Sequence, residues 1–130
     1  MSRSGYSDDG GGYEFAMWRG QVVSAIRGKR GQAFLREMID ALDAMPQKRL
    51  IKNEFWNGEA CALGVVAQRR VNIDPISVGP DENDRLAELF GVAHQLIREI
   101  EFENDEKLWR ATPEQRWQHM RDWAVRNLKP

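Results

Sequence analysis

The chain has 130 residues, the size of one ordinary domain, and its composition of 30% charged and 42% hydrophobic residues is typical of a soluble globular protein. Its net charge of −1 argues against a general nucleic-acid binder. Because Cys61 is the single cysteine, an intramolecular disulfide and a cage of several thiolates are both excluded.

The charges are segregated along the chain. Residues 13–52 carry eight Lys and Arg against four Asp and Glu, whereas residues 71–108 carry three against ten. Residues 109–130 are basic again, with five against two. This pattern predicts either a face that meets a charged partner or segments that complement one another inside the fold.

The first twelve residues are small, polar and rich in glycine, which predicts a disordered arm over 1–12 and a single mainly helical domain over 13–130. The N-terminus lacks the apolar core of a signal peptide. No apolar run approaches the roughly 20 residues of a membrane span. We therefore expect a cytoplasmic protein with no membrane contact.

Two helices joined by a short turn are predicted first. The apolar residues of the first are Phe15, Trp18, Val22 and Ile26, and those of the second are Phe34, Leu35, Met38, Leu42 and Met45. Both sets follow the spacing of one helix face. Gly28 fits the end of the first helix and Pro46 stops the second, so the pair resembles an αα-hairpin.

The centre of the chain contains a strong turn signal. Asn57-Gly58 suits a type I′ turn and predicts a β-hairpin with strands near residues 49–55 and 59–63. Residues 64–71 fit either an extension of the strand or a short helix, and we favour a helix from about Gly64. The expected fold class is mainly α with a small β-hairpin (α+β).

Three more helices follow a loop around Pro75, Gly79 and Pro80. The first two cover residues 85–90 and 93–106, with Gly91 between them. The motif Thr112-Pro113-Glu114-Gln115 predicts a capping box at the start of the last helix.

The stretch "IRGKRGQ" resembles a phosphate-binding loop. A P-loop needs a hydroxyl residue after its Gly-Lys pair and a glycine five positions before it, but Arg30 and Val23 stand there. The cations Arg27, Lys29 and Arg30 lie beside a predicted helix start, where an anion is favoured. They form either a surface for an anion or partner, or a solvated basic turn.

Residues 85–103 match the spacing of a helix-turn-helix, with a small residue at Ala87 and the turn at Gly91. The side chains that would read DNA are Ala93, His94, Gln95, Arg98 and Glu99. Carboxylates in and after this helix repel phosphates. We expect two packed helices here rather than a DNA reader.

An acidic set follows, made of Glu99, Glu101, Glu103, Asp105 and Glu106. It predicts either a recognition surface for a basic partner or a solvated face. Paired carboxylates could also serve acid–base chemistry, but neither His94 nor His119 is spaced to complete a site. No catalytic, metal or cofactor residue is assigned, and we expect no enzyme.

The chain has five tryptophans, at positions 18, 56, 109, 117 and 123. Trp18, Trp117 and Trp123 lie on helical stripes and are expected in the core. Trp56, beside the predicted turn, is harder to bury and is a candidate aromatic anchor for a partner.

The segments "WRGQVVSAIRGKRGQAFLREMIDALDAMPQKRLI", "GEACALG", "FGVA", "REIEFENDE" and "TPEQRW" are similar to a family of small proteins of tailed bacteriophages and prophages. The resemblance covers the chain from residue 15 onward. It implies a phage origin and action inside an infected bacterium, and it implies no catalytic residues.

Small phage proteins often act by binding a host protein. The expected function is therefore a non-enzymatic protein that binds a host or defence-system protein, most concretely an anti-CRISPR or similar counter-defence inhibitor. The alternative is a small helix-turn-helix regulator that binds nucleic acid. The sequence leaves the oligomeric state open.

Overall fold

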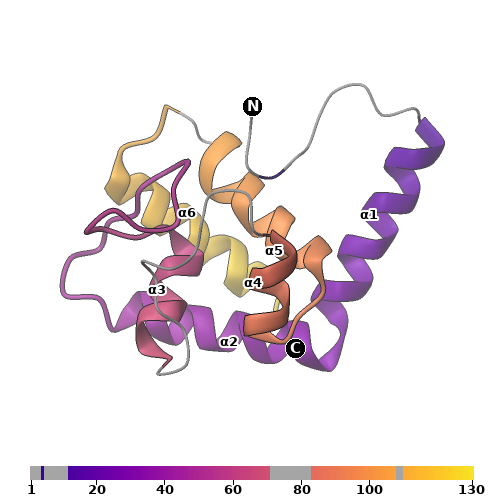
Figure 1. Ribbon diagram of the computed structural model, residues 1–130, viewed down its shortest axis with the longest axis horizontal. Coiled ribbons are helices and arrows are strands. Elements are labelled where there is room, and N and C mark those ends of the chain that lie inside the picture. The colour runs from indigo at the N-terminus through magenta and orange to yellow at the C-terminus, as the bar shows by residue number, and fades with distance from the viewer. Residues whose placement is uncertain (1–3, 5–11, 71–82, 108–109) are drawn as a thin grey trace.

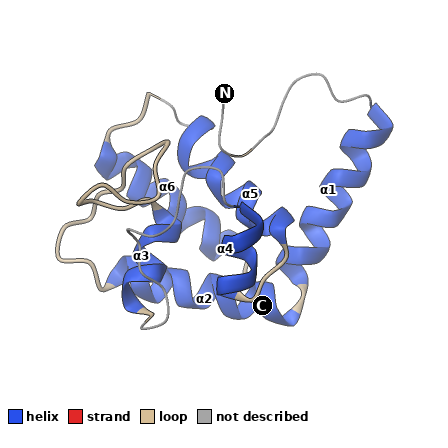
Figure 2. Cartoon of the chain, in the orientation of Figure 1, coloured by secondary structure: helices blue, strands red, loops and turns tan. Residues whose placement is uncertain are grey.

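The computed structural model describes residues 4, 12–70, 83–107 and 110–130. These residues form six α-helices and one π-helical turn, and they contain no β-strand (Figure 2). The elements are α1 (Gly12–Arg27), α2 (Lys29–Asp43), α3 (Ala62–Arg69), α4 (Asn83–Phe90), α5 (His94–Glu101), η2 (Phe102–Glu106) and α6 (Pro113–Arg126). The fold that the structure describes is thus all-α.

The helices are arranged around α2 and α5. Figure 1 shows α1 along one side of the molecule, meeting α2 at a corner, while α2 runs beneath the remaining helices. Helix α2 packs on α3 and α6, and α5 packs on α1, α3 and α4. The predicted arm over 1–12 lies outside the described residues except for Ser4 and Gly12.

One hydrophobic core joins the helices. Helix α2 contributes the expected stripe, with Phe34, Leu35, Met38 and Leu42 all buried. Residues 62–67 of α3 are buried without exception, because this helix is apolar on all sides. A methyl group on Gly64 would lie 2.3 Å from the carbonyl oxygen of Phe55, so the close packing of α3 needs a glycine there.

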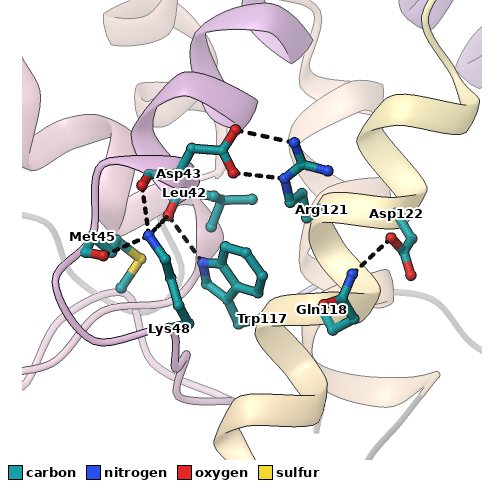
Figure 3. Close-up of polar contacts among 8 residues, drawn as sticks. All are labelled: Leu42, Asp43, Met45, Lys48, Trp117, Gln118, Arg121 and Asp122. Atoms are coloured by element: carbon teal, nitrogen blue, oxygen red, sulfur yellow. Dashed lines mark hydrogen bonds and ion pairs between the residues drawn. The ribbon is translucent and has the colours of Figure 1, made fainter.

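The end of α2 is fastened to α6 (Figure 3). The Trp117 indole donates to the Leu42 carbonyl at 3.1 Å, and the Lys48 ammonium donates to the carbonyls of Asp43 and Met45 at 2.5 and 2.6 Å. Lys48 therefore satisfies carbonyls that the last turn of a helix leaves without partners.

An ion pair lies beside these hydrogen bonds. Arg121 of α6 binds the Asp43 carboxylate through two nitrogens, at 2.6 and 3.1 Å. The Arg121 hydrogen bond holds the pKa of Asp43 below its ordinary value.

The predicted β-hairpin is wrong. Residues 49–60 form a loop with one isolated antiparallel β-bridge, between Trp56 and Ala60. The second expected strand, 59–63, overlaps the start of α3 at Ala62. The chain does turn at Asn57-Gly58, but only Gly58 has a positive φ, of 99°. A type I′ turn needs positive φ at both central residues, so the strand-pairing geometry is absent.

Two backbone hydrogen bonds link the arms of this loop, from the Ile51 amide to the Ala60 carbonyl at 3.0 Å and from the Cys61 amide to the Phe55 carbonyl at 3.3 Å, and side chains of η2 supply others. Asn104 accepts from the Ala62 amide and donates to the Ile51 carbonyl, at 3.1 and 2.9 Å. Asp105 accepts from the Asn53 amide at 2.9 Å. The loop is therefore held by a few backbone hydrogen bonds together with tertiary contacts to polar side chains, without a continuous pair of strands.

Two other local predictions are confirmed. Thr112 and Gln115 exchange side-chain to backbone hydrogen bonds in a capping box, with Pro113 as the first residue of α6. The helix favoured from about Gly64 is α3, which begins two residues earlier. The loop at Pro75, Gly79 and Pro80 lies outside the described residues.

Candidate functional site

The corner between α1 and α2 is built on two glycines with different roles. Gly28 is extended (φ −69°, ψ 163°); its amide donates to the Ser24 carbonyl and its carbonyl accepts from Gln32, so it ends α1 and begins α2. A methyl group on Gly31 would lie 1.9 Å from the Ala25 carbonyl oxygen. The close approach of the two helices thus requires glycine at position 31, and the backbone at Gly28 suits any L-residue.

Gln32 ties the C-terminal segment to this corner. Its amide nitrogen donates to the carbonyls of Ile26 and Asn127, at 2.7 and 3.0 Å, and its amide oxygen accepts from the Lys129 backbone at 2.8 Å. The side chain is 5% exposed. A buried amide with its donors and acceptor engaged fixes residues 127–129 against α1 and α2.

This arrangement gathers five cations, which we call the basic corner: Arg27, Lys29, Arg30, Arg126 and Lys129. All five residues are exposed, and none forms an ion pair with a described residue. Residues 15–36 and 123–130 contain no Asp or Glu. Among the described residues, the basic corner is therefore a surface of positive charge without an ion-pair partner.

A shallow groove crosses the basic corner, between the last turn of α1 and the segment after α6. We call it the tail groove. Its lining includes Val23, Ile26, Arg27, Arg126, Leu128 and Lys129, and its volume is about 280 Å³. Asn127 and Pro130 complete the lining, so apolar, polar and cationic residues border the same hollow.

The sequence alone predicted only half of this surface. The sequence predicts that Arg27, Lys29 and Arg30 lie together, but Arg126 and Lys129 join them only in the folded chain, because α6 packs on α2 and Gln32 holds residues 127–129. The absence of acidic residues over 15–36 and 123–130 is the feature that could have linked the two stretches.

The predicted acidic surface does not form. Glu99, Glu101, Glu103 and Asp105 are each at most 3% exposed. Glu106 is half-buried and accepts a hydrogen bond from Ser4. These carboxylates lie inside the fold because their helix turns them toward other elements, so they offer no exposed face to a basic partner.

The carboxylates of this segment have internal partners. Arg19 of α1 binds Glu99 with two hydrogen bonds, at 2.7 and 3.1 Å, and His119 of α6 contacts Glu103 at 2.8 Å. Arg116, 2% exposed, donates to the Asn104 carbonyl at 2.7 Å. Burial lowers the pKa of Arg116, and the charge of Asp105 opposes that shift.

The helix pair α4–α5 has the turn that the sequence predicted. Gly91 lies between the helices with a φ of 72°, and its amide donates to the Ala87 carbonyl at 2.8 Å. The second helix is covered, however. Trp18 of α1 makes an edge contact with His94, with ring centroids 5.9 Å apart, and lies under Arg98 at 5.6 Å.

Gln95 also contacts α1, donating to Gln21 at 3.3 Å. Four of the side chains that would read DNA are therefore engaged by α1: His94, Gln95, Arg98 and Glu99. Helix α5 cannot enter a major groove while α1 occupies that face.

Trp56 is partly buried and packs against the hydrophobic core, so it is not a freely exposed anchor. Trp117 and Trp123 are buried, as expected, and Trp18 packs against the core while half-exposed. Cys61 is buried within the hydrophobic core.

Two further observations concern chemistry and membranes. Within the described ranges, no group of three or more His, Cys, Asp or Glu side chains is arranged to hold a metal ion. None of the described helices combines the length and apolar character needed to cross a bilayer.

No protein-family model, curated protein or solved structure matches the chain.

Proposed function

We propose that this protein acts, without catalysis, by binding an acidic protein partner through the basic corner. The observation that carries the proposal is the basic corner itself. Five exposed cations from two remote segments, residues 27–30 and 126–129, lie together there, and none forms an ion pair with a described residue. Unpaired surface charge of one sign favours a partner of the opposite sign and accelerates encounter with it. The phage resemblance makes a host or defence-system protein the partner class we propose.

A helix-turn-helix regulator is the weaker candidate. Its reading helix is covered by α1. The basic corner could still contact phosphates, but sequence readout needs side chains that reach base edges. Duplex DNA is therefore the competing outcome of the experiment below.

The experiment is photocrosslinking in cells of the host bacterium, with a photoreactive amino acid in place of Arg27. The matched control carries it in place of Arg69, which is likewise an exposed arginine in the last turn of a helix. We expect one stoichiometric protein adduct at position 27 and none at position 69.

The same protein is then tested in a low-salt gel shift with duplex DNA. A shift that is lost with Lys29→Glu, together with no protein adduct, would overturn the proposal in favour of nucleic-acid binding. Equal adducts at positions 27 and 69 would also contradict it, because the basic corner would then not be the contact surface.

A further inference from the structure

The tail groove has an apolar floor beside a cationic rim. Ile26 is buried at its base, Leu128 packs against the core while half-exposed, and the Val23 side chain is 46% exposed. Three large hydrophobic residues are exposed in the described part of the chain: Met17, Val23 and Val125. Val23 therefore supplies apolar surface that no described part of the chain covers.

The walls of the groove are held together by hydrogen bonds within the fold. Gln32 fixes both of its walls, and Asn127 adds a hydrogen bond of 2.8 Å to the Trp123 carbonyl within the last turn of α6. Gly31 of α2 lies directly against the backbone of Ala25 in α1, so the two helices are in close contact at the corner. A preformed site loses little conformational entropy on binding.

The size of the groove limits what it can hold. Small-molecule sites are typically about 300–1,000 Å³, and this hollow, at about 280 Å³, is below that range and open to solvent. One bulky side chain fits such a hollow. The rim residues Arg27, Arg126 and Lys129 then lie where carboxylates on either side of that side chain can pair with them.

We infer that the tail groove recognises an acidic peptide segment of the partner, seating one large apolar side chain between Val23 and Leu128 and pairing flanking carboxylates with Arg27, Arg126 and Lys129. This inference rests on the proposed function and names the chemistry of its contact. An apolar centre within a charged rim is the usual anatomy of a protein interface. A nucleic-acid backbone would use the cations but would leave Val23 and Leu128 uncovered.

The test is an NMR titration of the whole protein with three probes. The first is the peptide Glu-Asp-Glu-Leu-Asp-Glu, the second has serine in place of leucine, and the third is a single-stranded oligonucleotide of equal charge. We expect the leucine peptide to bind about tenfold or more tightly than the serine peptide, because leucine buries apolar surface. Its shifts should centre on residues 23–32 and 126–129.

Variants assign the two halves of the site. Arg126→Glu should weaken both peptides at least tenfold, whereas Arg69→Glu, its counterpart in the last turn of α3, should change neither. Val23→Ser should remove the preference for leucine and leave the serine peptide unchanged. Since Val23, Arg126 and Arg69 are all exposed, the three variants are expected to fold.

Three results would each overturn the inference. The two peptides could bind with equal affinity, or the oligonucleotide could bind most tightly. Alternatively, Arg69→Glu could lower peptide affinity as much as Arg126→Glu does. If the crosslink at position 27 still captures a protein in that case, the proposed function stands and only the chemistry of the contact is wrong. If the crosslink fails, the proposed function falls, whatever the peptides do.

Discussion

The basic corner and the segment from Glu99 to Asp105 are both densely charged, yet they have opposite environments. In the acidic segment the carboxylates are buried and meet partners from α1, α6 and the loop before α3. In the basic corner the cations are exposed and make no ion pair with a described residue. The difference teaches that charge buried with partners serves the fold, whereas charge left unpaired at the surface is available to a partner.

The largest expected effect is in the buried segment. Arg116→Met should lower the free energy of unfolding by about 3–5 kcal/mol, since it removes one member of a buried polar network and leaves the Asp105 charge and the Asn104 carbonyl without it. Urea denaturation followed by tryptophan fluorescence measures the loss. Arg69→Met, at an exposed site, should change stability by no more than about 0.5 kcal/mol. Equal effects of the two variants would erase the distinction between buried and exposed charge.

The next effect tests the backbone beneath the basic corner. Gly31→Ala should destabilise the protein by about 1–3 kcal/mol or more, because its methyl group would meet the Ala25 carbonyl oxygen, which belongs to the backbone of α1. It should also displace Gln32 and so weaken peptide binding in the NMR titration. Gly28→Ala is the control, with ordinary φ and a nearest atom at 3.4 Å, and it should be neutral or slightly stabilising. A neutral Gly31→Ala would show that the helices can separate.

A smaller effect, of opposite sign, is expected from the cations themselves. The first turn of α2 has no acidic residue, and the dipole of a helix favours negative charge at its N-terminus. The double variant Lys29→Glu, Arg30→Glu should therefore raise the free energy of unfolding by about 0.3–1 kcal/mol. The same variant should weaken binding of the partner protein. Thermal unfolding and the crosslinking yield provide the two readouts. Loss of stability in this double variant would mean that the cations serve the fold after all.

The smallest effect is expected from the exposed pair Asp43–Arg121. Because the pair lowers the pKa of Asp43, its contribution is complete at neutral pH, above the ordinary value of 3.8, and disappears as the pH falls through the lower pKa of the folded state. The difference in urea midpoint between the parent and Asp43→Asn should be small at neutral pH. It should shrink toward zero in acid and in high salt. A difference that persists at low pH would mean that Asp43 acts through something other than its charge.

Much of the helical framework follows from sequence patterns. The apolar stripe at Phe34, Leu35, Met38 and Leu42 required a helix with one buried face, and that face is buried. The capping box at Thr112 and Gln115 fixed the start of α6 because its hydrogen bonds are local. The turn at Gly91 is equally local, since it needs only a residue that accepts a positive φ.

Patterns failed where the partners are distant in sequence. The Asn57-Gly58 turn exists, but Asn104, Asp105 and Arg116 supply hydrogen bonds that hold its loop without a continuous pair of strands. The acidic residues were expected on a surface because nothing in their spacing announces that Arg19 and His119 will meet them. The wrong hairpin and the wrong acidic surface have the same cause. In both, the deciding hydrogen bonds join side chains to groups at least 16 residues away in the sequence.

The sequence by itself determined most of the helices, the capping box of α6 and the positive charge on either side of Gly28, because each depends on residues within one or two turns. Only the tertiary structure decided which charges are buried, and only it brought Arg126 and Lys129 beside Arg27. The physical reason is that burial and pairing depend on contacts between remote segments, and here one buried glutamine makes those contacts at the basic corner.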